Sequence, residues 1–284
     1  MRLRLTVFIL VLATVFVGLG SFNLSRANEF KVEVLDVGQG DAILISTPSK
    51  LRILIDGGPG DQILTALGKS LPFFDRRIDV IISTHPDADH IEGLIPVIKK
   101  YKVRAVLRTD ANKDTQTWRT FNSLISEKKL QDEKIYLGDT INLADGVNFQ
   151  VLWPPAGELN KSEPNESSIV TKLSYKEADF ILTGDIGSFT ENRIAGLVKP
   201  EVLQAEVLKV AHHGSRFSSA DVFLEKVKPE IAAISVGANN FYGHPTPEAL
   251  SRLKAADILV FRTDEDGKIS FKLSEKGLVV STEK

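Results

Sequence analysis

Residues 81–93 read Ile-Ile-Ser-Thr-His-Pro-Asp-Ala-Asp-His-Ile-Glu-Gly. An apolar run typical of a buried strand ends at Ser83 and an apolar helical face begins at Ile91, so the residues between them form one strand-to-helix turn. Because this turn is extended at first and then enters a helix, its side chains can serve two metal ions from two directions. A plain polar turn with an aspartate N-cap is the alternative. The turn holds four potential metal ligands: His85, Asp87, Asp89 and His90.

The five histidines of the chain lie in three short segments, each after an apolar strand-like run. The second segment follows Val207–Val210 and contains His212 and His213. Adjacent imidazoles point in different directions, so we expect one to be a ligand and the other to support it or face a substrate. Which of the two is the ligand stays open. The third segment contains His244, which could bind or protonate a leaving group or could simply cap the following helix loop.

Another carboxylate follows a strand-like run. Asp185 comes directly after Phe180–Thr183 and Gly184. A Gly-Asp strand end is an ordinary turn when it stands alone. In combination with the histidine segments, this carboxylate could bridge two metal ions.

The rest of the chain alternates short β-branched runs with helical stretches. The early strands follow one another through short turns, and the later ones alternate with helices, which predicts two sheets, each covered by helices, in one domain. Helix starts are expected at a capping box, Ser218-x-x-Asp221, and at an N-cap, Thr246, followed by proline. The predicted strands are Lys31–Val37, Ala42–Thr47, Arg52–Ile55, Val80–Ser83, Ala105–Leu107, Phe149–Trp153, Ile169–Ser174, Phe180–Thr183, Glu206–Val210, Ile231–Val236, Leu259–Arg262, Lys268–Leu273 and Leu278–Val280.

The composition excludes several classes of protein. The 284 residues are 43% hydrophobic and 25% charged, as in a globular chain with enough apolar material for a core. There is no cysteine, which excludes disulfides, a thiolate nucleophile and cysteine-ligated zinc or iron–sulfur sites. The net charge of −2 gives no global attraction for nucleic acid.

Residues 1–27 have the pattern of a secretory signal peptide. Arg2 and Arg4 precede an apolar stretch, Leu5–Gly20, and Ser25-Arg26-Ala27 offers small residues for cleavage. The apolar stretch is short for a membrane span, but an uncleaved anchor is the alternative. In either case we expect residues 28–284 to be secreted or extracytoplasmic, with membrane contact only through residues 1–27 if they are retained.

Several motifs together resemble the metallo-β-lactamase superfamily and, within it, the hydrolase domain of the ComEC-type competence proteins that take up DNA. Besides Thr-His-x-Asp-x-Asp-His, they are Leu35-Asp36-Val37-Gly38-Gln39-Gly40-Asp41-Ala42, Ile55-Asp56-Gly57-Gly58, Thr183-Gly184-Asp185 and His212-His213-Gly214-Ser215. The resemblance runs from about Phe30 to Leu278. The multi-spanning channel region of full-length ComEC proteins is missing, so the resemblance implies a stand-alone, exported hydrolase domain over residues 28–284.

The resemblance implies an α/β (α+β) fold, a four-layer αββα sandwich with its metal site at one edge. His85 and Asp87 would contribute to one metal ion, Asp89 and His90 to the other, and Asp185 would bridge them. His212 or His213 would complete the second site. The residues that would support the ligands or face the substrate are Asp36, Gln39, Asp41, Asp56, Asn165 and Ser215.

The sequence departs from the commonest superfamily pattern in two places. Asp87 stands where a second histidine is usual, and Asn165-Glu166-Ser167-Ser168 replaces a ligand histidine in mid-chain. Oxygen in place of imidazole hardens a site, so the cofactors expected are two divalent ions, Zn²⁺ or Mn²⁺, with Mn²⁺ supporting activity at least as well as Zn²⁺.

The predicted activity is a phosphodiesterase or nuclease that acts on DNA or another phosphodiester through attack by metal-bound hydroxide. Asp89 or Asp185 would orient the attacking group, and His244 would act at the leaving group. One alternative is an esterase or lactonase that uses the same metal chemistry on a carbonyl. Another is a binding module without catalysis, with a degenerate metal site. No obligate protein partner is expected.

Export is directly testable. Cleavage after Ala27 should leave Asn28 as the first residue of the mature protein, because the small-residue site ends there. Terminal sequencing of the protein from cell fractions checks this. An intact Met1 in the membrane fraction would establish the anchor instead.

Overall fold

The computed structural model describes residues 29–143, 145–158, 163–275 and 277–284. Within these ranges, no helix combines the length and the apolar character that crossing a membrane requires. The predicted signal peptide or anchor, residues 1–27, lies outside the described residues.

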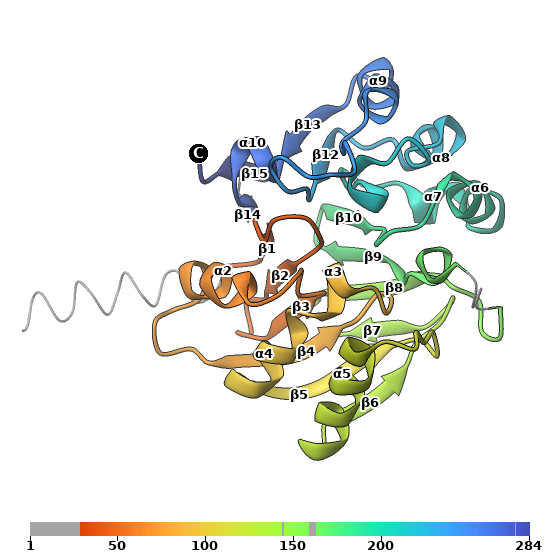
Figure 1. The fold of residues 1–284 in the computed structure, drawn as a ribbon. Coiled ribbons are helices and arrows are strands. Elements are labelled where there is room, and N and C mark those ends of the chain that lie inside the picture. Colours follow the sequence, from red (N-terminus) through yellow and green to blue (C-terminus); the bar gives the residue numbers. More distant parts are fainter. Residues whose placement is uncertain (1–28, 144, 159–162, 276) are drawn as a thin grey trace, which may run out of the picture.

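The described strands form two mixed sheets (Figure 1). The first sheet has the order β15-β14-β1-β2-β3-β4-β5-β6, in which β3 to β6 are parallel. Its strands are β1 (Lys31–Val34), β2 (Ile43–Ser46), β3 (Arg52–Ile55), β4 (Arg77–Ile82), β5 (Lys102–Arg108), β6 (Gln131–Lys134), β14 (Ile269–Ser274) and β15 (Gly277–Thr282).

The second sheet has the order β13-β12-β11-β10-β9-β8-β7, in which β10 to β13 are parallel. Its strands are β7 (Thr140–Asn142), β8 (Asn148–Trp153), β9 (Val170–Tyr175), β10 (Ala178–Leu182), β11 (Val207–Lys209), β12 (Ile231–Ile234) and β13 (Leu259–Arg262). The helices are α2 (Gln62–Ser70), α3 (Ala88–Ile91), α4 (Leu94–Lys100), α5 (Gln116–Glu127), α6 (Ser188–Leu197), α7 (Pro200–Leu203), α8 (Asp221–Val227), α9 (Pro247–Ala255) and α10 (Thr263–Asp266), with short 3-10 turns at Pro164–Ser167 and Ala211–Gly214.

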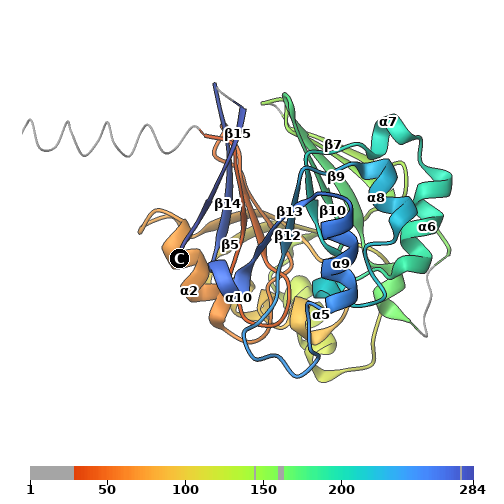
Figure 2. The same ribbon diagram turned by 90° about the horizontal axis from the view of Figure 1, so that it is seen from above.

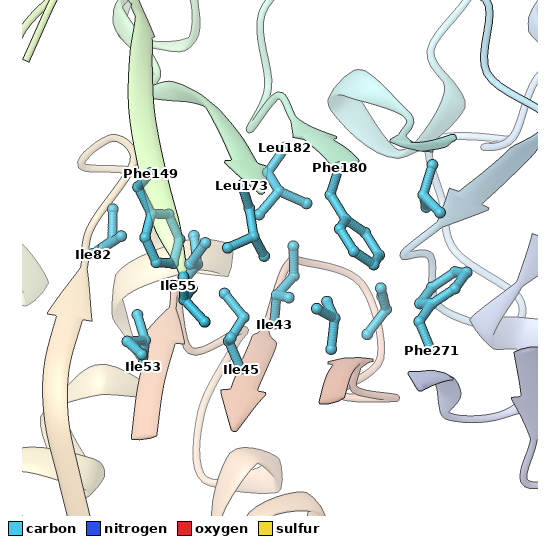
Figure 3. Packing of buried hydrophobic residues seen from close by; sticks show 14 of the residues in the cluster. Ile43, Ile45, Ile53, Ile55, Ile82, Phe149, Leu173, Phe180, Leu182 and Phe271 are labelled. Atoms are coloured by element: carbon cyan, nitrogen blue, oxygen red, sulfur yellow. The ribbon is translucent and has the colours of Figure 1, made fainter. Parts of the chain in front are cut away.

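Three apolar clusters hold four layers together. One cluster lies between the sheets, where Ile43 and Ile55 of the first sheet meet Phe149 and Phe180 of the second (Figure 3). A second cluster joins the outer face of the first sheet to α2, α4 and α5. A third joins the second sheet to α6, α8 and α9, which lie on its outer side in Figure 2. The predicted αββα sandwich is confirmed.

Parallel strands bring the candidate site residues to one edge. The carboxyl ends of neighbouring parallel strands meet at the same edge of a sheet, and ligands bind there in open α/β sheets. Asp56 follows β3 and His85 follows β4, while Asp185 follows β10 and His213 follows β11. Apolar strand interiors therefore build the core, and their polar ends build the site.

The structure differs from the predicted elements in several places. The strands β6 and β7 were not predicted, because both lie at sheet edges where polar side chains are tolerated. The helical face from Ile91 to Ile98 is divided between α3 and α4 at Gly93. A Cβ atom at Gly93 would lie 2.0 Å from the carbonyl oxygen of Gly57, so the two backbones approach as only glycine allows.

The predicted N-cap at Thr246 is confirmed, since its side chain accepts a hydrogen bond from the amide of Ala249. The predicted capping box before α8 is wrong. The N-cap of α8 is Ala220, and the hydroxyl of Ser218 donates to the carbonyl of Ser215 instead. The carboxylate of Glu191 accepts hydrogen bonds from the amides of Ser219 and Ala220, and so takes the place of a local cap.

The Glu191 carboxyl group is fully enclosed between α6 and the segment that leads into α8. Burial raises its pKa to about 7, although the two amides that it binds act in the opposite direction. A glutamate whose pKa is raised on folding stabilises the fold fully below its ordinary pKa of 4.5, and this stabilisation is lost as the pH rises through about 7.

We therefore expect Glu191→Gln to flatten the pH dependence of unfolding between pH 4.5 and 7. The free energy of unfolding of wild type, minus that of the variant, should decrease by up to about 3 kcal/mol as the pH rises through this window. The wild type is therefore favoured at low pH. Urea unfolding at several pH values measures it. Glu201→Gln, at an exposed position, is the matched control and should keep the wild-type slope. Equal slopes for wild type and Glu191→Gln would contradict the assignment.

Candidate metal centre

Four potential ligands converge where the two sheets meet. Asp89 and His90 come from the start of α3, Asp185 from the end of β10 and His213 from the turn after β11. One ligand atom from each lies within 4.8 Å of all the others. The Oδ2 atom of Asp185 is 3.3 Å from the Nε2 atoms of both His90 and His213, and the Nε2 atom of His213 is 3.5 Å from Oδ2 of Asp89.

These distances fit a metal ion. Ligands about 2.0–2.2 Å from a tetrahedral ion lie about 3.3–3.6 Å from one another, which matches the three distances given above. The Nε2 atoms of His90 and His213 and the Oδ1 atom of Asp185 are buried without a well-formed hydrogen bond. Buried polar atoms normally have partners. A divalent ion would give both Nε2 atoms a partner, and two imidazoles with two carboxylates suit Zn²⁺ or Mn²⁺.

Hydrogen bonds fix the orientation of both imidazoles. The Nδ1 atom of His90 is 2.7 Å from Asp56, whose carboxylate also accepts from the amide and hydroxyl of Thr84. The Nδ1 atom of His213 is 2.8 Å from the carbonyl of Ser235. Each contact leaves Nε2 directed at the cluster, which is how outer partners orient histidine ligands in metalloproteins.

A buried ion pair supports His213 from behind. Lys209, at the end of β11, pairs with Asp41, and the side chain of Lys209 is only 1% exposed. The other oxygen of Asp41 is 3.3 Å from Nδ1 of His213. Sequence reasoning placed Asp41 near the metals but missed Lys209. The available signal was a lysine inside the apolar run of β11, where a buried cation requires an anionic partner.

Backbone packing places the turn that carries Asp89. The glycine-rich loop before β2 lies against it, and a Cβ atom at Gly40 would come within 2.1 Å of the carbonyl oxygen of Asp89. The amide of Asp41 donates to the same carbonyl oxygen. The Gly57 amide, after β3, donates to the carbonyl of His90. The motifs around residues 38–41 and 55–58 thus hold the ligand turn through its backbone.

The two adjacent histidines occupy different positions because of an unusual backbone. His212 and His213 have φ values of 48° and 54°, in the left-handed region that L-residues rarely adopt. His213 is buried in the cluster. The side chain of His212 is 34% exposed, with its Nε2 atom 4.0 Å from Asp185. The geometry therefore favours His213 as the ligand and leaves His212 facing the cavity.

The ionisation of the cluster follows from its charges. Burial alone would raise the pKa of Asp185, but His213 and His90 outweigh burial and hold it well below its ordinary value. Burial would lower the pKa values of His90 and His213, and the facing carboxylates reverse this. Burial, together with the neighbouring His90, lowers the pKa of His85 to about 4, so its ring is neutral at pH 7.

A cavity of about 240 Å³ opens onto the cluster. Most of its lining residues are ones that the sequence analysis selected. The exception is Tyr242, whose role no sequence signal indicated. The lining residues are Gln39, Asp87, Asp89, Asn165, Asp185, His212, His213, Tyr242 and His244.

His85 and Asp87 lie beside the cluster without joining its four ligands. The Nε2 atom of His85 is buried without a hydrogen bond, and His85 groups with His90 and Asp56. In that group, however, Asp56 and Nδ1 of His90 already bind each other. The carboxylate of Asp87 pairs with Lys113, 3.0 Å away, a partner that sequence analysis missed. The described residues thus gather four ligand atoms around one position, and the second metal ion stays a prediction.

Two further predicted residues lie outside the cavity. Asp36 is exposed and lines a separate pocket with Lys69 and Glu283. Ser215 is buried, and its hydroxyl accepts a hydrogen bond from the amide of Phe217, so it shapes the turn after His213. Neither contact brings these side chains to the ligand cluster.

The fold and the strand-end ligands agree with the sequence comparison. The profile described as the metallo-beta-lactamase superfamily matches residues 35–238, and the chain belongs to this superfamily. Within it, the resemblance to ComEC-type competence proteins is confirmed.

Two curated relatives show the extent of that similarity. ComE operon protein 3 of Bacillus subtilis is 30% identical over 267 residues, which cover 88% of this chain and 34% of that protein. Competence protein ComA of Neisseria gonorrhoeae is 29% identical over 252 residues, which cover 88% of this chain and 33% of that protein. The chain thus spans about a third of the length of these relatives.

Solved structures share the fold at low sequence identity. The metallo-beta-lactamase fold protein YhfI of Bacillus subtilis superposes with a TM-score of 0.58 at 11% identity and covers 86% of this chain and all of that one. CmlA, a diiron β-hydroxylase of Streptomyces venezuelae, has a TM-score of 0.58 at 12% identity and covers 87% of this chain and 54% of that one. At these identities the likeness concerns the fold alone.

The different positions of the two adjacent histidines lead to a prediction. His213→Ala removes a nitrogen from the cluster, so its affinity for Zn²⁺ and Mn²⁺ should fall by more than the roughly 10–100-fold that loss of a supporting residue costs. His212→Ala, the matched control, keeps all four ligand atoms and should lose less than about tenfold. Calorimetric titration with each metal provides the measurement. A larger loss in His212→Ala than in His213→Ala would show that the ligand has been assigned to the wrong histidine.

Proposed function

We propose that this chain is an exported metal-dependent phosphodiesterase that acts on DNA or another phosphodiester. The observation that carries the proposal is the convergence of Asp89, His90, Asp185 and His213 at the floor of an open cavity. A divalent ion held there would polarise a phosphate oxygen and lower the pKa of a water molecule. The second predicted ion would add to this, with His85 beside it.

The side chains that line the cavity have separate roles in binding and orienting the reactants. Asp89 reaches both the cluster and the cavity, so its other oxygen can orient an attacking water. Burial would raise the pKa of Asp89, but His213 and His90 hold it well below its ordinary value, so Asp89 orients the water and is a poor acceptor of its proton. His212 is exposed to the same space and can hold a substrate oxygen. Gln39 and Asn165 add neutral hydrogen-bonding groups to the wall.

His244 is suited to binding in its neutral form. Burial and the neighbouring His212 and His213 lower its pKa to about 4, and its Nδ1 atom has no hydrogen-bond partner. A neutral imidazole is a poor proton donor, but it can hydrogen-bond a leaving oxygen or accept a proton. We therefore place His244 beside the leaving group as a hydrogen-bonding residue.

The choice of a phosphodiester rests on the relatives. One matched relative is named competence protein ComA. The sequence motifs resemble the hydrolase domain of ComEC-type proteins, and this resemblance implies a DNA substrate. Ester or lactone hydrolysis is the second candidate, because the same metal chemistry attacks a carbonyl. A binding module with a degenerate site is disfavoured by the buried Nε2 atoms of His90 and His213, which converge on one position and lack a well-formed hydrogen bond.

Loss of Asp89 tests the function. We expect Asp89→Ala to reduce hydrolysis of bis-p-nitrophenyl phosphate and DNA by at least about 1000-fold, because it removes both a ligand and the group that faces the attacking water. The His85→Ala variant should also be inactive if a second ion binds there. Assays with added Mn²⁺ and with added Zn²⁺ provide the measurement.

The matched control is Asp114→Ala, which removes an exposed carboxylate away from the cavity and should keep wild-type activity. Nitrocefin and a lactone are run in parallel. Hydrolysis of these carbonyl substrates without phosphodiester cleavage would replace the proposal by the second candidate. No hydrolysis of any substrate by metal-loaded wild type would favour the binding module.

A further inference from the structure

Exposed aromatic side chains lie on the two loops that follow β11 and β12, and both loops contribute residues to the cavity at the metal centre. Phe241 is fully exposed, Tyr242 is 69% exposed and Phe217 is 60% exposed. Tyr242 lines the cavity, Phe241 precedes it in the chain, and Phe217 follows His213 by four residues. Large apolar side chains in water forgo the free energy of burial, so such a group beside a cavity indicates a ligand that covers it.

The loop that carries Phe241 and Tyr242 is braced by one side chain. The Oδ1 atom of Asn240 accepts hydrogen bonds from the amides of Tyr242 and His244, 3.1 and 3.0 Å away. Its Nδ2 atom donates to the carbonyls of Gly237 and His244. The aromatic rings are therefore presented on a preorganised loop, and little conformational entropy is lost when a ligand binds to them.

The exposed ring of Tyr242 stacks on His244, and the ring of His244 lies near that of His213 in the metal centre. His213 and His244 have ring centroids 6.4 Å apart with planes at 36°. The next step, from His244 to Tyr242, is 5.8 Å at 25°. A flat ligand on the outer face of Tyr242 would extend this series away from the ligand cluster, at a spacing typical of aromatic contacts.

A cation stands beside a second exposed ring on the neighbouring loop. The guanidinium of Arg216 lies 4.7 Å from the centroid of the Phe217 ring. The two loops are tied together, because the amide of Thr246 donates to the carbonyl of Gly214. An aromatic ring with an adjacent exposed cation can receive a base and the phosphate attached to it.

We propose that Phe241, Tyr242 and Phe217, here called the aromatic rim, stack unpaired nucleobases, so that the substrate class is single-stranded nucleic acid. This inference rests on the proposed phosphodiesterase function. Base faces are available for stacking only where the strand is unpaired, and they are hidden inside a duplex. Stacking also tolerates any base, so the rim would position the backbone at the metal centre without selecting a sequence.

The test compares two oligonucleotides that differ only in their bases. One is a short oligothymidylate and the other is its abasic counterpart, both with phosphorothioate linkages that resist cleavage. Fluorescence anisotropy with the full chain and Mn²⁺ gives both affinities. We expect wild type to prefer the base-bearing strand by about tenfold or more, and Phe241→Ala/Tyr242→Ala to bring the two affinities close to equality.

The matched control is Phe73→Ala/Phe74→Ala, which removes another exposed aromatic pair, from the segment between α2 and β4. This variant should keep the wild-type preference for bases. No preference in wild type, or a preference that survives in Phe241→Ala/Tyr242→Ala, would overturn the rim proposal. If the aromatic rim instead binds a protein partner, wild type should show no preference for the base-bearing strand.

Hydrolysis of bis-p-nitrophenyl phosphate by wild type separates the two proposals. If wild type hydrolyses it but binds both oligonucleotides equally, the rim proposal fails while the phosphodiesterase function stands. If base-dependent binding is found but no phosphodiester is cleaved, the chain binds single strands and the proposed activity fails.

Discussion

The site depends on the contact of the Asp185 carboxylate with the imidazoles of His90 and His213, between which it is buried. A buried charge is costly unless opposite charge or a metal faces it. Asp185 and His213 come from the second sheet and His90 from the first, so this balance also joins the two sheets at their polar edge. The pair of Asp41 and Lys209 makes a second such link. Hydrophobic packing holds the sheets face to face, and these charged contacts join them at the edge where that packing ends.

The same balance links metal binding to protonation. In the metal-free protein, the raised pKa values of His90 and His213 let protons offset the charge of Asp185 and Asp89. An ion that binds the Nε2 atoms displaces these protons, so its affinity weakens as the pH falls. The hydrogen bonds behind the ligands, from Asp56 to one imidazole and from Ser235 to the other, use the Nδ1 atoms and leave both Nε2 atoms available to an ion. Hydrogen bonds therefore fix the orientation of the ligands, and the charge of the site changes with the protonation of its histidines.

Sequence alone predicted the fold and the segments that form the site, because apolar strands that end in histidine and aspartate are local features. It did not predict contacts that depend on distant residues. The pairing of Asp87 with Lys113 joins positions 26 residues apart. The difference between His212 and His213 arises from two left-handed residues in succession, which no pattern in the sequence specifies. The failed capping box has the same cause, because Glu191, 28 residues before Ser219, binds the amides instead.

The shared fold does not determine the reaction. The fold protein YhfI and CmlA superpose on this chain equally well, although CmlA is a β-hydroxylase, whose chemistry is oxidative. What the strands supply is a place where ligand side chains converge. What a particular protein does there must depend on the loops that approach this place, and here the loop after β12 brings His244 and Tyr242. The loop of Asn240 is largely exposed, and the hydrogen bonds of Asn240 hold the backbone that presents Tyr242 and His244. On the rim proposal, selection among substrates belongs to residues that neither bind the metal nor build the sandwich.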